Sequence, residues 1–474
     1  IQLLAEQVEV KTIIKNSAFR IEQPLVETTA APRDLEWGIE MINADDVWAM
    51  GYRGQGVVVG GQDTGYDWQH PALIGKYRGW DGSTADHNYN WHDAIHEINP
   101  LNGDPTPDPS NNPCGLDSPF PCDDGSHGTH TMGTIVGSEG ENEIGVAPDA
   151  KWVACRNMER GWGSPVSYIE CFEWLMAPTD LNNENPDPGQ SPHVFANSWS
   201  CPEIEGCDAS NWSVMETVVN NVKASGIVVV VSAGNSGSNG CSSVSTPAAM
   251  FENSFTIGST RPNDRISGFS SRGPVLVDNS GRMKPNVSAP GSQVRSSVPG
   301  NDYATFSGTS MAGPHVVGLV ALMISANPAL AGQVETIEDL IEQTAVPKTI
   351  EDEDCGELTG LEVPNNTYGY GRVDALAAVE AALSLTPTEE VVAHEAFAVY
   401  PNPVVDRLFF DFKTISGKVN LALFNTKGQQ IGDWRWEVGI GEQKSVDLSS
   451  MPTGVYFYTL ETAADHFEGK VLRH

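Results

Sequence analysis

The chain has 474 residues, more than one ordinary domain needs, and hydrophobic residues make up 39% of it, enough to fill a sizeable core. Against 27 Lys and Arg stand 62 Asp and Glu, a formal net charge of -35 at pH 7. Phosphate backbones and anionic membranes repel such a chain, which argues against nucleic acid as a partner. The carboxylates indicate either a soluble surface in a salty or extracellular medium, or ligands for a hard cation such as calcium.

Cysteine usage indicates an oxidising compartment. The eight cysteines are an even number and none lies in a CxxC pair, which favours disulfides over a zinc cluster. Their connectivity stays open, although Cys114–Cys122 and Cys201–Cys207 each close a short loop and are the first pairings expected. The longest strongly apolar run, 227–231, is far too short to span a membrane.

An α/β domain is predicted over residues 30–385, after an apolar, mixed-charge segment at 1–29 that ends in proline and small residues. Strand-like apolar runs alternate there with helical patterns, which is typical of a mainly parallel sheet. The run at 227–231 is β-branched throughout, as a parallel strand covered on both faces is. Buried strands are expected at 55–59, 151–154, 194–198 and 227–231.

Helical patterns lie between and after these strands. Ser164 followed by Pro165 marks a helix start, with an N-cap before proline at the first helical position. Val214, Val218 and Val222 share one face of a second helix. Two further helices are expected, at 311–323 and 375–383.

Three segments depart from the α/β pattern. Residues 99–124 contain seven prolines and five aspartates, which predicts a long surface insertion. Residues 386–396 have the composition of a linker. Residues 397–474 switch to a period of two between turn segments, which predicts a small antiparallel β-sandwich appended to the α/β domain.

Asp63 follows an apolar strand in VVVGGQDTG, at the strand end where an open α/β sheet places its active site. Aspartic proteases also use DTG, but they need a second carboxylate to share a proton, and the chain has no second DTG. The alternative for Asp63 is an Asx-turn at the end of the strand.

His127 lies in DDGSHGTHTMGTIVG, where the small residues that follow predict a helix start with an uncovered imidazole. A metal site that uses His127 and His130 is the weaker interpretation, because no third ligand lies nearby in the sequence. His87, His92 and His96 form a similar weak cluster, for which surface or core roles are favoured over zinc.

Ser310 lies in FSGTSMAGPHVVGLVALM, between Gly308 and a predicted helix whose N-terminus would direct N–H groups at a developing oxyanion. A serine hydroxyl needs an imidazole to take its proton, and the imidazole needs a carboxylate to fix its tautomer. Asp63, His127 and Ser310 occur in one of the chain orders known for this triad. Asn235, in VVVSAGNSG after a buried strand, could donate its amide to the oxyanion, although alone it would be read as a turn residue.

The strings DTG, HGTHTMGTIVG, SAGNSG and GTSMAGPHVVG resemble, in order, the active-site signatures of the subtilisin-like serine peptidases, from about residue 34 to 385. The long, cysteine-containing insertion between Asp63 and His127 resembles the bacillopeptidase F-like branch. The resemblance implies a three-layer α/β fold and a secreted serine endopeptidase. It implies that Ser310 is the nucleophile, His127 the general base and then acid, Asp63 the orienting carboxylate, and Asn235 an oxyanion donor.

Family members bind substrate as an added strand. The resemblance places substrate at two segments: Ser198, Trp199 and Ser200, then Ser232, Ala233 and Gly234. Ser200 stands where the family usually has glycine, which puts the adjoining pockets in doubt. The second segment has no ionisable residue, which favours an apolar P1 side chain. The piece Ser245–Ala248 resembles the family's cis-proline turn near the primary pocket.

No cofactor is expected for the chemistry. Structural calcium, common in the family, is an expectation without a named set of ligands. Residues 1–29 resemble the end of the family's inhibitory propeptide, with an ordinary N-terminal extension as the alternative. Residues 397–474 resemble the type A sorting domain read by the type IX secretion system, with an adhesive or carbohydrate-binding sandwich as the alternative.

The partners expected are therefore protein or peptide substrates and the secretion machinery, with the protein released or held at the cell surface. A non-catalytic binding protein on a degenerate peptidase fold is the rival from another class, and an intact triad argues against it. A lipase or esterase would need a G-x-S-x-G elbow, whereas Ser310 lies in GTSMA.

Overall fold

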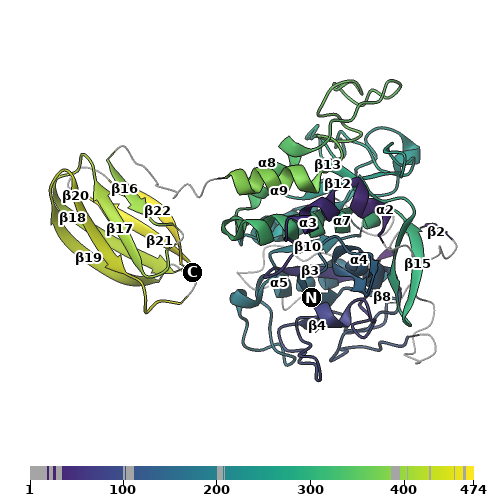
Figure 1. The fold of residues 1–474 in the computed structure, drawn as a ribbon, viewed down its shortest axis with the longest axis horizontal. Helices are drawn as coiled ribbons and strands as arrows, with labels where there is room; N and C mark the ends of the chain where they lie inside the picture. Colours follow the sequence, from purple (N-terminus) through teal and green to yellow (C-terminus); the bar gives the residue numbers. More distant parts are fainter. Residues whose placement is uncertain are drawn as a thin grey trace. The chain divides into compact units, whose positions relative to one another are not determined.

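The structure is a computed structural model, and the chain in it divides into two compact units, Ile1–Leu383 and Ser384–His474 (Figure 1). The described residues are 19–20, 25–27, 35–99, 102, 112–199, 207, 209–385, 396–402, 404–425, 429–452, 454–462 and 466–473.

A seven-stranded sheet forms the centre of the larger unit. Its order is β13-β12-β11-β10-β3-β7-β4, and every neighbouring pair is parallel, which confirms the predicted α/β class. All residues of β11 are buried, as its β-branched sequence predicts. The strands are β3 (Val58–Asp63), β4 (Trp91–Asp93), β7 (Lys151–Arg156), β10 (Val194–Asn197), β11 (Val228–Ser232), β12 (Phe255–Thr260) and β13 (Val287–Pro290).

The strand β3 begins three residues later than the sequence predicts. Gly54 and Gly56 take φ values of 95° and 81°, and the Val57 N–H donates to the Gly54 carbonyl at 3.2 Å. Left-handed glycines favour a turn over extended chain, so the predicted first residues of the strand form that turn instead. The other three predicted strands begin within one residue of their expected starts.

Helices cover both faces of this sheet, so that the larger unit has three layers: helices, sheet and helices (Figure 1). The helices α4 (His127–Val136) and α7 (Thr309–Ala326) pack together, and α5 (Pro165–Met176) packs with α6 (Trp212–Ala224). A Cβ at Gly313 of α7 would lie 3.7 Å from Val230, whereas Val229 and Val231 share a core cluster with α5 and α6. Successive residues of a strand point to opposite faces, so the two helix pairs lie on opposite sides of β11.

The helix α7 is the core helix of the larger unit. By length and composition it could cross a membrane, but 89% of its apolar window is buried inside the unit. Further described helices are α2 (Trp37–Met41), α3 (Ala44–Ala49), α8 (Val334–Thr344) and α9 (Ala375–Ser384), and short 3-10 turns lie at Ile74–Lys76, Pro188–Gln190, Gly237–Asn239 and Pro328–Leu330.

The predicted start of α5 is confirmed. The Ser164 side chain accepts from Ser167 N–H, and the Ser167 side chain returns a bond to the Ser164 backbone, a capping box with proline at the next position. The predicted face of α6 is partly wrong, because Val214 is exposed while Met215, Val218, Val219 and Val222 are buried. The buried face therefore runs through Met215 at the usual helical spacing.

Short strands decorate the larger unit in three small sheets. One has the order β1-β9-β8, a second has the order β14-β15-β2, and β5 pairs with β6. Their bounds are β1 (Phe19–Arg20), β2 (Leu25–Glu27), β5 (Ser138–Glu139), β6 (Asn142–Glu143), β8 (Met158–Glu159), β9 (Trp162–Gly163), β14 (Val294–Val298) and β15 (Asp302–Ser307).

The smaller unit consists of antiparallel strands, as the period of two predicts. They form two sheets, β16-β17-β20 and β19-β18-β21-β22, whose inward residues make one core cluster. The strands are β16 (Phe397–Tyr400), β17 (Arg407–Phe412), β18 (Gly417–Asn425), β19 (Gln430–Val438), β20 (Glu442–Asp447), β21 (Gly454–Glu461) and β22 (His466–Arg473).

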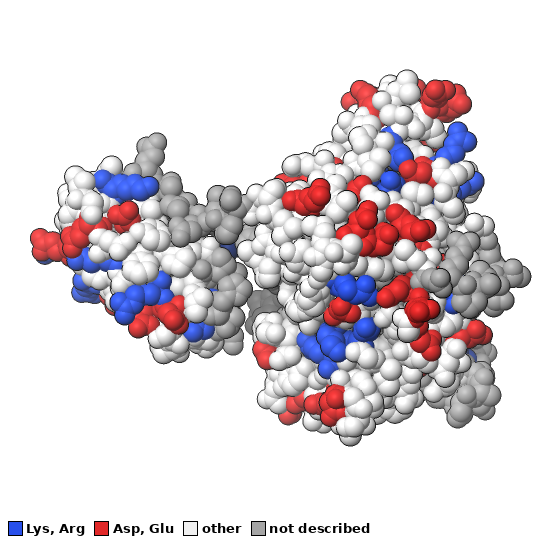
Figure 2. Space-filling model, viewed as in Figure 1, with Lys and Arg blue, Asp and Glu red and all other residues white. Residues whose placement is uncertain are grey.

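Charge on the larger unit is dispersed. Figure 2 shows the carboxylates of the face in view in several separate groups, with Lys and Arg among them. Carboxylates dispersed in this way keep a protein soluble through mutual repulsion, but they do not gather into a cluster of cation ligands. On the face in view, the distribution favours the solubility interpretation of the net charge.

The described part of the larger unit contains disulfides over short and long stretches of the chain. The predicted Cys114–Cys122 bond is present, and the structure adds Cys155–Cys171 and Cys241–Cys355. Cys201 lies outside the described residues, so its predicted pairing with Cys207 stays a prediction.

Because a disulfide that closes a longer loop restricts the unfolded chain more, we expect the Cys241–Cys355 bond to stabilise the fold more than Cys114–Cys122. Their sequence separations are 114 and 8 residues. Loop entropy predicts losses of about 5 and about 2.5 kcal/mol when each pair is replaced by serine. Urea unfolding of the two double variants measures both losses, and equal losses would contradict the loop-length account.

Candidate active site

Asp63 and His127 form a buried pair at the carboxyl end of the sheet. Asp63 is the last residue of β3, His127 is the first of α4, and both are 2% exposed. His127 Nδ1 lies 2.8 Å from each carboxylate oxygen of Asp63. The Thr64 N–H donates to Asp63 Oδ1 at 2.7 Å, which fixes the carboxylate from the other side. A carboxylate on Nδ1 leaves Nε2 as the basic nitrogen of the neutral ring.

Ser310 is the second residue of α7, directly after Thr309. Its hydroxyl donates to the Ser198 carbonyl at 3.3 Å, and His127 Nε2 is buried without a hydrogen-bond partner in the described part of the chain. The structure thus joins Asp63 to His127 and does not join His127 to Ser310. Catalytic hydrogen bonds of this kind are often long before substrate binds.

Asn235 lies beside the start of α7. Its Oδ1 accepts from both the Thr309 N–H at 2.9 Å and the Thr309 hydroxyl at 3.0 Å, which fixes the orientation of the amide. A Cβ at Gly308 would lie 3.6 Å from Asn235 Nδ2 and 3.7 Å from Ser310 N. The two donors therefore flank one small space, kept open by glycine, at the positive end of a helix.

The two predicted substrate segments follow neighbouring strands. Ser198 and Trp199 follow β10, while Ser232 ends β11 and its hydroxyl lies 3.4 Å from that of Ser198. Trp199 is 2% exposed and its ring stacks on Tyr168 at 3.7 Å between ring centroids, so its side chain belongs to the core. Ser200 lies outside the described residues.

Ala233 and Gly234 open onto a pocket of about 320 Å³ directly before Asn235 in the chain. The Gly234 N–H donates to the Thr309 hydroxyl at 3.2 Å, which ties this segment to the start of α7. The pocket lining carries no charged side chain and is rich in hydroxyl groups. The lining residues are Ala233, Gly234, Ser236, Asn239, Cys241, Ser242, Ser243, Ser245, Thr246 and Ser271.

The sequence interpretation of this pocket was incomplete. Ser245 and Thr246 line the pocket, as their resemblance implies, but the cis peptide bond joins Pro247 to Ala248 and does not precede the proline. The apolar P1 preference rested on three residues alone. Most of the lining comes from the turn after Asn235, whose hydroxyl groups make the pocket uncharged but polar.

Histidines outside the pair take structural roles. His130 Nε2 bonds to the carbonyls of Val294 and Ala304 at 3.1 Å, and burial lowers the pKa of His130 to about 3, so it stays neutral. His92 and His96 both contact Glu170, at 2.7 Å and 2.8 Å. Within the described ranges, no group of three or more His, Cys, Asp or Glu side chains could hold a metal ion.

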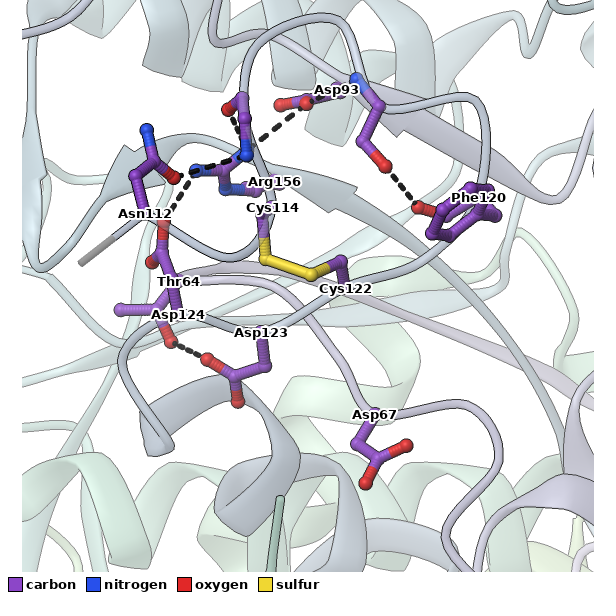
Figure 3. Close-up of a disulfide and its surroundings, with 12 residues drawn as sticks. Thr64, Asp67, Asp93, Asn112, Cys114, Phe120, Cys122, Asp123, Asp124 and Arg156 are labelled. Atoms are coloured by element: carbon purple, nitrogen blue, oxygen red, sulfur yellow. Dashed lines mark hydrogen bonds and ion pairs between the residues drawn. A yellow bond between two sulfur atoms is a disulfide. The ribbon is translucent and has the colours of Figure 1, made fainter. Parts of the chain in front are cut away.

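Of the insertion predicted at 99–124, the described segment 112–124 is partly exposed and partly packed inside. Arg156, fully buried, donates to Asp93 at 3.1 Å, to the Gly115 carbonyl at 3.1 Å and to Asp124. Burial raises the pKa of Asp124 to about 6, although Arg156 opposes the rise. Figure 3 shows this cluster beside the Cys114–Cys122 bond.

A carboxylate-bound imidazole, a serine at a helix start and two flanking N–H donors are the groups that define a serine hydrolase on an α/β sheet. A subtilase family profile matches residues 54–371 of this chain. The chain therefore belongs to the subtilase family, as its motifs suggest.

Curated relatives agree with this assignment. The chain is 39% identical over 356 residues to bacillopeptidase F of Bacillus subtilis (strain 168), covering 73% of this chain and 22% of that protein. It is 30% identical over 315 residues to subtilisin amylosacchariticus of Bacillus subtilis subsp. amylosacchariticus, covering 66% of each. It is 29% identical over 358 residues to M-protease of Shouchella clausii (strain KSM-K16), covering 74% of this chain and 72% of that protein.

A second profile matches the smaller unit. Residues 398–472 match a secretion system C-terminal sorting domain. The chain thus combines a subtilase domain with a sorting domain, the combination that its sequence resembles.

Proposed function

We propose that this protein is a secreted serine endopeptidase. The observation that carries the proposal is the bond from His127 Nδ1 to both carboxylate oxygens of Asp63, at the sheet edge where Ser310 is the second residue of α7. His127 Nε2 takes the proton of the Ser310 hydroxyl as that oxygen attacks the peptide carbonyl, and later gives it to the leaving amine. Water then hydrolyses the acyl-enzyme: His127 Nε2 takes a proton from the attacking water and gives it to the Ser310 oxygen as that oxygen leaves.

Charge on the tetrahedral intermediate is stabilised by two donors, Asn235 Nδ2 and Ser310 N. Their support is the geometry around Gly308, with the Asn235 amide held by Thr309. Donors fixed before reaction need no reorganisation as charge develops, which lowers the barrier. No cofactor enters this chemistry, and structural calcium stays a prediction that chelator-dependent melting would test.

Substrate lies as an extended strand along Ser198–Trp199 and Ser232–Gly234, with its P1 side chain in the pocket beside Asn235. We propose an uncharged P1 residue, because no charged group lines the pocket to pair with Lys, Arg, Asp or Glu. The hydroxyl lining accepts polar as well as apolar side chains.

Replacing the nucleophile tests the whole scheme. Ser310→Ala is expected to lower peptide hydrolysis by at least about a thousandfold while leaving the fold intact, because the hydroxyl makes the acyl bond. The measurement is turnover of a colourimetric peptide, with labelling by a serine-directed fluorophosphonate as the second readout. Normal turnover in the variant, or labelling of another residue, would contradict the triad assignment. A non-catalytic binding protein would then be the better interpretation.

The N-terminal segment is proposed to be the end of an inhibitory propeptide. Its β1 pairs antiparallel with β9, and its β2 pairs with β15 so that Leu25 lies opposite Ser307, three residues before Ser310. The strand β9 borders the substrate segments, since a Cβ at Gly163 would lie 2.5 Å from Tyr168 Oη, and Tyr168 stacks on Trp199. The segment thus pairs with a strand near the substrate segments and with the strand that leads to the candidate nucleophile.

The enzyme is expected to cut its own chain near the end of residues 1–29, because β1 and β2 both belong to that segment and must leave together. Mass spectrometry of the purified wild type should find the new N-terminus there. Ser310→Ala, the matched control, should keep the segment intact. An uncut wild type that is nevertheless active would favour an ordinary N-terminal extension.

The smaller unit is proposed to be a sorting domain that directs secretion and has no role in the chemistry. A unit with its own core folds independently, and all the candidate catalytic groups lie in the other unit. A chain ended after Leu385 should keep its kcat/KM on small peptides within about twofold, yet fail to leave the cell. Normal export of the truncated chain would refute the sorting role and favour a binding sandwich.

A further inference from the structure

The carboxylate of Asp123 lies beside the Asp63–His127 pair, at the end of the Cys114–Cys122 loop. Its Oδ1 accepts from the Thr64 hydroxyl and from the N–H groups of Gly125 and Ser126, all at 2.8 Å. Its Oδ2 accepts from the N–H of Thr129 at 3.0 Å and from the hydroxyl of the same residue. One side chain thus holds the turn after β3 and the first turn of α4.

Thr64 links Asp123 to both Asp63 and the residue after His127. Its N–H donates to Asp63 Oδ1 at 2.7 Å, and its hydroxyl oxygen accepts from the Gly128 N–H at 3.1 Å. Gly128 directly follows His127, and a Cβ on it would lie 3.0 Å from the Asp63 Cβ. The hydroxyl of Thr64 therefore sets the separation between the carboxylate and the imidazole, and Asp123 sets the hydroxyl.

Asp123 is itself held on both sides in the chain. Cys122, the residue before Asp123, forms the disulfide with Cys114, and its carbonyl oxygen accepts from the Tyr66 N–H at 3.1 Å. Asp124 is ion-paired with the buried Arg156. Figure 3 shows Asp123 next to the disulfide, with its bond to Thr64 drawn. Such anchoring suits a residue that positions others and does not itself contact substrate.

We propose that Asp123 is a positioning residue that acts through Thr64 to keep the Asp63–His127 pair in its reactive geometry. The proposal rests on the function proposed above. Small misplacements of reacting groups cost up to about a hundredfold in rate. The cost falls on kcat, because neither Asp123 nor Thr64 lines the P1 pocket.

Thr64→Val is the sharpest test, because it keeps the side-chain volume and removes both the donor to Asp123 and the acceptor for Gly128. We expect kcat to fall about 10- to 100-fold with KM within about twofold of wild type. The acid limb of the kcat/KM profile should move to lower pH, because a displaced carboxylate stabilises the imidazolium less. Thr64→Ser, which retains the hydroxyl, should restore kcat and the profile.

Thr134→Val is the matched control. Thr134 is also a buried threonine, in α4, and among the described residues its hydroxyl bonds only to the His130 carbonyl, at 3.2 Å. This variant should match wild type in kcat and in its pH profile. Asp123→Asn is the second variant, since its amide can serve the Thr64 arm or the Thr129 arm but not both, and it should also lower kcat.

A readout that does not depend on hydrolysis separates this proposal from the proposed function. On the Ser310→Ala background, the His127 Nδ1 proton resonance should shift or broaden with Thr64→Val and stay unchanged with Thr134→Val. An unchanged resonance and wild-type kcat in Thr64→Val would overturn the positioning role. A lower unfolding temperature with kcat and KM changed together and no shift of the acid limb would also overturn it, in favour of a merely structural bond.

Discussion

The hydrogen-bonded pair of Asp63 and His127 is the constraint around which this active-site region is built. Both side chains are 2% exposed, and an isolated carboxylate at that depth would be driven to take up a proton. The fold keeps the carboxylate supplied with donors, from the imidazole and from the Thr64 N–H. The end of β3 and the start of α4 must therefore stay in register, which explains why glycine and threonine fill the space between them.

The same demand extends outward as a layer of buried charge. Arg156 ends the strand next to β3, opposite Asp63 in register, and it contacts Asp93, the last residue of β4, and Asp124, which lies between β4 and α4. Breaking one partner of such a cluster would strand a buried charge, which costs more than an exposed ion pair contributes. A segment rich in proline and aspartate thus becomes part of the support of the active site.

Most of what the sequence predicts about the fold and the candidate site comes from short sequence motifs. The motif around Asp63, the helix starts at His127 and Ser310, and the β-branched run of β11 each depend on neighbours in the chain, and the structure has them near their expected places. The missing parts depend on contacts between distant segments. Nothing in the sequence near Asp123 reveals its bond to Thr64, 59 residues away, and the lining of the pocket and the Cys241–Cys355 bond are likewise products of tertiary packing.

The N-terminal strands β1 and β2 occupy sheet edges of the kind that an extended peptide can use. In their small sheets, β9 lies between β1 and β8, and β15 lies between β14 and β2. Without β1 and β2, each strand would present unpaired N–H and C=O groups, which is the template that an extended peptide completes. Backbone pairing is independent of side-chain identity, so these edges can hold many sequences. On the function proposed above, selectivity falls to the pocket beside Asn235, whose lining carries no charged side chain.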